Sequence, residues 1–273
     1  MTTDAGKVVL VTGVSSGFGR AIAADLQSRG HRVFGTTRNP QAQAPPGCSH
    51  VRMDVDDDES VASGVAEVLK KAGHVDVLVN NAGFGYAGAV EDMTIDEARR
   101  QFETNFFGMH RLCRAVLPQM RARRTGRIVN MSSLGGLVGI PFQAVYCASK
   151  FAVEGYTEAL RMELRPFGIQ VAMIEPGDFA TRFTASRRMI AASSPQSPYA
   201  ERCAIAVRRM AEDESSNPDI APVVRAAVRA IEARRPRLRY PAANALQRTL
   251  VALRPLLPQP LFEYLILDNY GIR

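Results

Sequence analysis

The stretch from 133 to 150, SLGGLVGIPFQAVYCASK, carries a tyrosine and a lysine four residues apart. If this stretch continues into a helix, Tyr146 and Lys150 project from one face, which places an ammonium beside a phenol. A phenol in water has a pKa of about 10, and a neighbouring positive charge lowers that pKa by favouring the phenolate. The spacing therefore predicts that Tyr146 donates or accepts protons at neutral pH. The plainer alternative is an exposed helix face, so other residues must decide between the two.

A serine precedes this pair at the end of a predicted strand. Residues 127–132 (RIVNMS) form an apolar run that leads into Ser133, and open α/β sheets bind their ligands at the carboxyl ends of their strands. A hydroxyl at that edge can hydrogen-bond a carbonyl oxygen and hold it for proton transfer. A nucleophilic role has no support, because Ser133 lacks a GxSxG motif and no histidine follows His110.

An asparagine interrupts the longest helical pattern, which extends from 95 to 124 and is broken by TNFFG at 104–108. Asparagine is unfavourable inside a helix because its side chain competes for backbone hydrogen bonds. We therefore expect a local kink at Asn105 that holds a water molecule. An asparagine without a special role in an ordinary helix is the alternative.

A glycine-rich turn near the amino terminus joins a predicted strand, 7–12, to a predicted helix, 20–30. The turn reads TGVSSGFG, a GxxxGxG spacing with Gly13, Gly17 and Gly19. Such a turn lets the backbone approach a pyrophosphate while the free amides of the helix face the anion. A side chain at Gly19 would push the helix away from the strand. A strand-to-helix turn without a ligand is the alternative.

The next predicted strand, 32–37, ends in two threonines followed by Arg38. A carboxylate at this point would bind the ribose 2'-hydroxyl of NAD, whereas an arginine favours the 2'-phosphate of NADP. We therefore expect NADP(H) to be preferred over NAD(H), with a surface arginine as the alternative. A third strand is expected at 51–55, where Asp54 could meet the adenine amino group, and the acidic run 56–60 is expected to cap the following helix.

Two more turns follow predicted strands. Residues 75–80 lead into the sequence Asn-Ala-Gly at 81–83, which has almost no side-chain bulk and would let a cofactor lie against the backbone. Residues 170–175 lead into Pro176 and Gly177. The first of these turns is expected at the edge of the sheet where the cofactor binds.

The composition excludes several classes of protein. With 273 residues, 46% hydrophobic and 22% charged, the chain is neither disordered nor collagen-like. The net charge of +7 would permit an acidic partner, but the arginines are scattered through helical patterns and no binding-module signature accompanies them, so no nucleic-acid partner is expected.

The four cysteines, Cys48, Cys113, Cys147 and Cys203, are far apart and do not cluster with the histidines. Neither a disulfide framework nor a metal site is expected. The first predicted strand leaves no room for a signal peptide, and no apolar run is long enough to span a bilayer. We therefore expect a cytoplasmic protein.

Taken together, TGVSSGFG, NNAG, Asn105, Ser133 and YCASK resemble the short-chain dehydrogenase/reductase family, in its short single-domain branch, over residues 7–181. The resemblance implies a Rossmann-like, doubly wound parallel α/β sheet and a cofactor that carries the hydride. It also implies a catalytic tetrad, in which Tyr146 is the acid-base, Ser133 orients the carbonyl, Lys150 lowers the tyrosine pKa and holds the nicotinamide ribose, and Asn105 anchors a relay water. The expected cofactor contacts are Gly13, Ser15, Ser16, Gly17, Phe18, Gly19, Arg38, Asp54, Val55, Asn81, Ala82, Gly83, Tyr146, Lys150, Pro176, Gly177 and Thr181.

Residues 136–171 are most similar to 17β-hydroxysteroid and retinol dehydrogenases, whose substrates are lipophilic alcohols and ketones. This similarity implies an enzyme that interconverts a ketone or aldehyde and an alcohol on a steroid-, retinoid- or aryl-ketone-like substrate, as a homodimer or homotetramer. A catalytically silent NADP-binding sensor or scaffold is the alternative. Such a protein would not need all four tetrad residues.

The last third departs most from the family pattern, although the whole chain, 1–273, is expected to be one domain. Residues 183–209 mix apolar side chains with SSPQSP and are expected to form a substrate lid. The tail, 245–273, is rich in leucine and proline. It could cap the pocket, contact a second subunit or associate weakly with a membrane surface, and we favour the first two.

Overall fold

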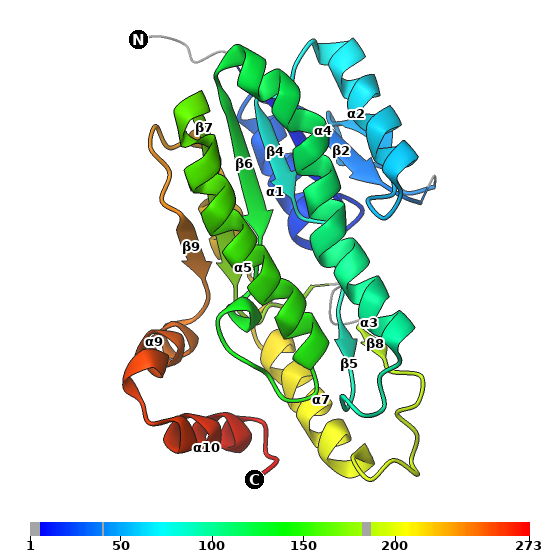
Figure 1. Ribbon diagram of the computed structural model, residues 1–273, viewed down its shortest axis with the longest axis vertical. Coiled ribbons are helices and arrows are strands. Elements are labelled where there is room, and N and C mark those ends of the chain that lie inside the picture. The colour runs from blue at the N-terminus through cyan, green and yellow to red at the C-terminus, as the bar shows by residue number, and fades with distance from the viewer. Residues whose placement is uncertain (1–5, 40, 182–186) are drawn as a thin grey trace.

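Seven parallel strands form one continuous sheet in the computed structural model, which describes residues 6–39, 41–181 and 187–273 (Figure 1). Their short β-branched runs are buried on both faces, as expected for a parallel sheet covered by helices. The order along the sheet reverses beside the first strand, so the predicted doubly wound α/β fold is confirmed. In spatial order the strands are β3 (Ser49–Arg52), β2 (Arg32–Thr37), β1 (Val8–Thr12), β4 (Val77–Asn80), β6 (Gly126–Met131), β7 (Ile169–Pro176) and β9 (Arg239–Ala242).

Helices cover both faces of the sheet. Successive residues of a strand point to opposite faces, so Leu10 lies in the core beneath α2, α4 and α5, while Val9 and Val11 lie in the core beneath α1 and α8. The helices are α1 (Gly17–Ser28), α2 (Asp58–Ala72), α4 (Gly108–Arg123), α5 (Ala144–Leu164) and α8 (Ala221–Glu232).

Beyond the carboxyl edge of the sheet lies a smaller layer, in the lower half of Figure 1. Its third hydrophobic core joins the loop at Val138 to Met210 of α7 and to Phe262 and Ile266 of α10. The layer contains α7 (Ala200–Ser215), α9 (Ala245–Leu253), α10 (Gln259–Asn269) and the paired strands β5 (Tyr86–Ala87) and β8 (Arg188–Met189). The remaining elements are connections between those already named: α3 (Ile95–Phe102), the π-helix η1 (Glu103–Phe107), and the 3-10 turns η2 (Leu134–Gly136), η3 (Arg165–Phe167) and η4 (Arg254–Leu256).

The predicted boundaries differ from the structure in two places that matter for the site. The third strand ends at Arg52 rather than at Val55, so Asp54 and Val55 lie in the turn after the strand. Part of the expected lid, 183–186, lies outside the described residues. The remainder forms β8, a loop and the first part of α7.

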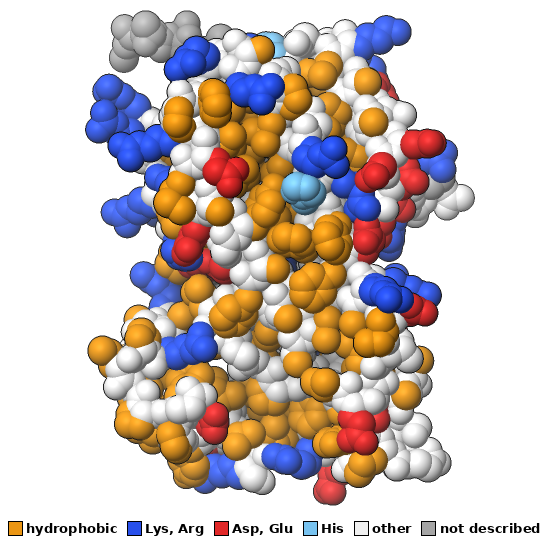
Figure 2. Space-filling model, in the orientation of Figure 1, with side chains coloured by type: hydrophobic (Ala, Val, Ile, Leu, Met, Phe, Trp, Pro, Cys, Tyr) orange, Lys and Arg blue, Asp and Glu red, His pale blue; other side chains and the backbone are white. Residues whose placement is uncertain are grey.

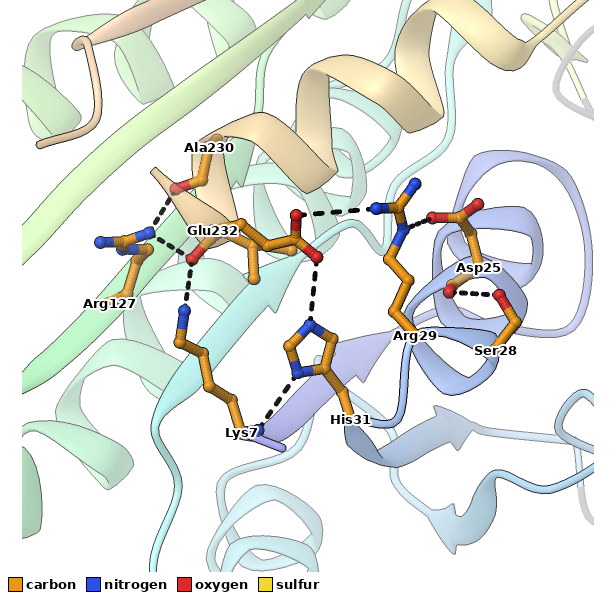
Figure 3. A network of polar contacts seen from close by, with 9 residues as sticks. Lys7, Asp25, Ser28, Arg29, His31, Arg127, Ala230 and Glu232 are labelled. Carbon is orange, nitrogen blue, oxygen red and sulfur yellow. Dashed lines mark hydrogen bonds and ion pairs between the residues drawn. The ribbon is translucent and has the colours of Figure 1, made fainter. Parts of the chain in front are cut away.

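A polar network closes the amino edge of the sheet (Figure 3). Lys7 Nζ donates to Ile231 O at 3.2 Å, and Arg127 Nη1 donates to Ala230 O at 2.9 Å. These carbonyls belong to the last turn of α8, where cations are favoured by the helix dipole and by the unpaired carbonyl groups. The network therefore fastens α8 to β1 and β6 at the edge opposite the predicted site.

Candidate active site

The glycine turn has the close backbone approach that the sequence predicts. Gly13 and Gly17 have positive φ angles, +71° and +57°, which favour glycine. A Cβ on Gly19 would lie 2.3 Å from Asn81 Nδ2 and 2.5 Å from Gly13 O. Asn81 Nδ2 itself donates to Thr12 O at 2.9 Å. The side chain of Asn81 thus fixes the turn to the end of β1.

A cleft of about 550 Å³ opens above this turn, at the carboxyl ends of β1, β2 and β4. Its size and its glycine-lined floor fit a dinucleotide, and the amino end of α1 faces it. Of the predicted cofactor contacts, those that line it are Gly13, Ser15, Ser16, Gly17, Phe18, Arg38, Asp54, Val55, Asn81, Ala82, Gly83 and Thr181. The sequence analysis missed Thr36, Thr37, Met53, Phe84, Thr104 and Arg188, which also line it.

Charged groups gather where the cleft passes the ends of β2 and β3. Asp54 Oδ1 accepts a hydrogen bond from Asp56 N at 3.1 Å, and Thr104 Oγ1 donates to Asp56 Oδ2 at 2.8 Å. Burial raises the pKa of Asp56, while Thr104 and the positive charge of Arg38 oppose that rise. The expected acidic cap of α2 is Asp57, which accepts from Ser60 N.

Arg188 reaches the same cleft from β8, with its guanidinium 4.7 Å from the centre of the Phe84 ring. Strand β8 pairs with β5, which lies about a hundred residues earlier in the chain. No local pattern in the sequence signals this pairing, which explains why Arg188 was not predicted.

A second pocket, of about 110 Å³, adjoins the cleft and shares Phe18, Asn81, Gly83 and Thr181 with it. It brings together the remaining predicted site residues except Gly19 and Asn105. Those that line it are Ser133, Tyr146, Lys150, Pro176 and Gly177. Because α5 begins at Ala144, Tyr146 and Lys150 occupy its first two turns.

The Tyr146 hydroxyl and the Ser133 hydroxyl are hydrogen-bond partners in this pocket. Ser133 caps the 3-10 turn η2, and its Oγ accepts from Gly135 N at 3.1 Å. The cap fixes the serine side chain beside the tyrosine. Two hydroxyls held together in this way can both bind one carbonyl oxygen.

The predicted lowering of the Tyr146 pKa is wrong for the structure. Burial raises the pKa of Tyr146, against the hydrogen bond from Ser133, and the nearby Cys147, Glu214 and Asp178 raise it further. Lys150 Nζ donates to Met131 O at 2.8 Å and lies 5.9 Å from the centre of the tyrosine ring. The ammonium therefore bonds the end of β6. Burial also lowers the pKa of Lys150 to about 8, although Glu154 opposes this.

Asn105 lies in the π-helix η1, which confirms the predicted kink. Its Oδ1 accepts from Phe84 N and its Nδ2 donates to Phe84 O, both at 3.0 Å, and Nδ2 also donates to Ser149 Oγ at 3.1 Å. Asn105 lines a small cavity of about 10 Å³ beside the cleft, which is at the lower limit for one water molecule. The side chain thus fixes the loop at Phe84 to α5.

A family model described as short chain dehydrogenase matches residues 7–190. The chain belongs to the short-chain dehydrogenase family. It is 38% identical to a 3-ketodihydrosphingosine reductase from Bacteroides thetaiotaomicron over 98% of this chain and 99% of that protein. It is also 40% identical to retinol dehydrogenase 8 from Bos taurus, over 66% of this chain and 61% of that protein.

Solved structures of the same family share the whole fold. A short-chain dehydrogenase from Streptomyces avermitilis superposes with a TM-score of 0.83 and 34% identity, over 99% of this chain and 98% of that one. A family member from Burkholderia phymatum, in complex with NAD, superposes with a TM-score of 0.81 and 27% identity, over 94% and 95% of the two chains. The chain is therefore an oxidoreductase of a family that binds nicotinamide cofactors and acts on CH–OH groups.

Other features of the described residues bear on the expected partners and compartment. No helix among them is long and apolar enough to cross a membrane. They contain no group of three or more His, Cys, Asp or Glu side chains that could hold a metal ion. All four cysteines are free thiols.

Proposed function

We propose that this protein is a single-domain NADP(H)-dependent short-chain dehydrogenase that interconverts a ketone or aldehyde and an alcohol on a lipophilic substrate. The observation that carries the proposal is the position of the paired Ser133 and Tyr146 hydroxyls. They line a pocket that shares Asn81, Gly83 and Thr181 with the dinucleotide cleft.

The catalytic roles follow from this arrangement. The bound cofactor supplies or accepts the hydride. Ser133 and Tyr146 hold the carbonyl oxygen, and Tyr146 transfers the proton to or from it. Because burial raises its pKa, the phenol stays protonated at neutral pH, which suits donation to a ketone. The Lys150 ammonium stabilises negative charge on this side of the pocket and is placed to bind the cofactor ribose, while Asn105 positions the loop at Phe84.

The preference for NADP(H) is supported by the charges beside the end of β2. This strand ends in Thr36 and Thr37, so no carboxylate stands where NAD-specific folds bind the ribose, and Arg38 lines the cleft directly afterwards. Arg188 adds a second guanidinium to the cleft wall. Arg38, with no carboxylate at the end of this strand, favours a 2'-phosphate.

A lipophilic substrate is supported by an apolar groove of about 700 Å³ between the start of α5 and α10. Ile140 lines both this groove and the pocket of Tyr146, so the two adjoin at this side chain. The other apolar side chains that line the groove include Ala144, Cys147, Phe151, Phe262 and Ile266. We propose that it takes the apolar part of the substrate, with 183–209 as the lid and 245–273 as the outer wall. Two similar proteins are named for a ketodihydrosphingosine and for retinol.

Association into a homodimer or homotetramer is supported by the exposed face of α4 and α5. Figure 2 shows hydrophobic side chains across the face of the molecule to which these helices contribute. Phe107 of η1, beside the start of α4, and Met162 of α5 are 45% and 70% exposed, which is unusual for large apolar side chains.

The test is a screen of the purified protein for oxidation of NADPH or NADH against long-chain ketones, retinal, steroid ketones and short ketones. We expect turnover with NADPH and a lipophilic carbonyl. Consumption restricted to short ketones would contradict the substrate class, and a better rate with NADH would contradict the cofactor preference. Tight NADPH binding without turnover of any carbonyl would instead favour the silent sensor or scaffold.

A further inference from the structure

One wall of the Tyr146 pocket is acidic, which the proposed reaction does not require. Asp178 follows the turn after β7, and Glu214 lies in the last turn of α7. Both carboxylates line the pocket together with Ser133 and Tyr146. Both carboxylates also raise the pKa of Tyr146, so they lie on the side of the pocket that a substrate at its hydroxyl would face.

Glu214 is 7% exposed, and only one of its oxygens is used. Oε1 pairs with the guanidinium of Arg187, whose side chain is itself 4% exposed. Oε2 has no hydrogen-bond partner in the part of the chain that the structure describes, and neither has Nε of Arg187. A buried carboxylate oxygen without a donor is costly, so its presence beside a substrate pocket indicates a ligand that brings the donor.

Asp178 accepts a side-chain hydrogen bond from Gln247 Nε2 of α9 at 2.5 Å. Burial raises its pKa to about 6, and the neighbouring carboxylates of Glu214 and Asp213 add to that rise, while Gln247 and the cation of Arg187 oppose it. Asp213 faces Arg209 of its own helix at 3.4 Å. Among the described residues of this wall, the guanidinium of Arg187 therefore faces two carboxylates, which leaves a net negative charge.

Lys150 also lines the pocket but, among the residues that the structure describes, forms no ion pair with Asp178 or Glu214. Lys150 Nζ donates to Met131 O, and its charge is favoured by Glu154, its neighbour along α5. A carboxylate substrate would add a third negative charge beside Asp178 and Glu214, and a neutral ketone would leave Glu214 Oε2 without a donor. An ammonium supplies both the missing charge and the missing donor.

We propose that the pocket selects ketones that carry an ammonium group within a few bonds of the carbonyl, with Glu214 and Asp178 as its receptors. This inference rests on the proposed function and narrows its substrate class to lipophilic amino ketones. The carbonyl faces Ser133 and Tyr146, the ammonium faces α7, and the alkyl chain passes Ile140 into the apolar groove. The ammonium is unchanged in the reaction, because the hydride adds to the carbonyl carbon and Tyr146 gives its proton to the oxygen.

The experiment compares two substrates that differ in one group: a long-chain 2-amino-3-ketone and the same 3-ketone without the amine, each with NADPH. The wild type, Glu214→Gln, Asp178→Asn and the exposed α7 control Glu201→Gln are assayed for kcat and KM, and folding is checked by circular dichroism. We expect the wild type and the control to favour the amine. We expect the ratio of kcat/KM values to fall by about tenfold to a hundredfold in Glu214→Gln, mainly through KM, and by less in Asp178→Asn.

The outcomes separate this inference from the proposed function. Equal turnover of both ketones by the wild type, or equal losses on both ketones in folded Glu214→Gln and Asp178→Asn, would overturn the ammonium site while the reductase assignment stands. If Glu214→Gln does not fold, the ratio for Asp178→Asn decides by itself. If the wild type oxidises no NADPH in the presence of any carbonyl tested, the proposed function fails and the ammonium site fails with it.

Discussion

The two edges of the sheet differ in how fully their buried polar groups are hydrogen-bonded. At the amino edge every group in the network of Figure 3 has a partner: Lys7 and Arg127 bond the carbonyls at the end of α8, and His31 Nε2 lies 3.4 Å from Glu232 Oε1. At or beyond the carboxyl edge, several buried side-chain atoms have no hydrogen-bond partner among the described residues. They include Asp56 Oδ1, Asn80 Oδ1 and Glu214 Oε2.

This difference in hydrogen bonding indicates that the amino edge contributes mainly to stability and the carboxyl edge mainly to ligand binding. A satisfied network lowers the free energy of the folded chain and gains nothing from a ligand. Unpaired polar atoms raise that free energy unless a ligand pairs them, so they concentrate where ligands bind. Substitutions at the two edges should therefore separate stability from activity.

The largest effect should come from removing the hydroxyl at the carboxyl edge. Tyr146→Phe deletes the proton donor, and we expect kcat to fall about 10²- to 10⁴-fold, with NADPH affinity and melting temperature nearly unchanged. The matched control is Tyr156→Phe on the same helix, whose hydroxyl bonds His110 Nδ1 at 3.0 Å away from the pocket. Normal turnover by Tyr146→Phe would contradict its assigned role.

The opposite result is expected at the amino edge. Arg127→Met leaves Ala230 O and Ala233 O, now bonded at 2.9 and 2.7 Å, without their donor. We expect the free energy of unfolding in urea to fall by about 2–4 kcal/mol, while kcat of the folded enzyme is kept. Arg121→Met, on the exposed face of α4, should change neither quantity. A loss of kcat in folded Arg127→Met would show that the two edges are coupled.

A smaller effect should follow from reversing one charge at the cofactor cleft. Arg38→Asp places a carboxylate where NADP would carry its 2'-phosphate. We expect the ratio of kcat/KM values for NADPH and NADH to shift toward NADH by about tenfold or more. Arg225→Asp on α8 controls for the change in net charge. An unchanged ratio would mean that another group, such as Arg188, binds the phosphate.

The smallest effect concerns pH. The pKa of Lys150 is about 8, so the ammonium is lost as pH rises through this value, and the rate of ketone reduction should fall there. The Glu154 carboxylate favours the charged lysine. Glu154→Gln should therefore move this fall to lower pH by less than about one unit, whereas Glu163→Gln, exposed on the same helix, should not. A fall that moves to higher pH, or does not move, would remove Glu154 from this role.

The features that the sequence predicted correctly are local. The strand at 7–12, the glycine turn and the interruption at Asn105 each follow from residues that lie within one element or one turn. The prediction of a doubly wound sheet follows from their order along the chain. Local patterns suffice here because strand burial, positive φ angles and helix interruption are decided by near neighbours.

The features that were wrong or missed depend on contacts between distant segments. The Tyr146 pKa was expected to fall because Lys150 is four residues away, but burial raises it, and Cys147, Glu214 and Asp178 add to that rise. Arg188 reaches the cleft only because β8 pairs with β5, and Glu214 reaches the pocket from a helix with an ordinary amphipathic pattern. Sequence spacing carries no information about contacts between segments that are far apart in the chain.

The hydrogen bond from Gln247 to Asp178 ties the carboxyl-terminal segment to the turn that holds the pocket. A Cβ at Gly177 would lie 2.3 Å from Gln247 Oε1, so this turn and α9 are fitted to each other. A substitution at Gln247 can therefore shift Asp178 and change the shape of the pocket wall without altering Ser133 or Tyr146 themselves.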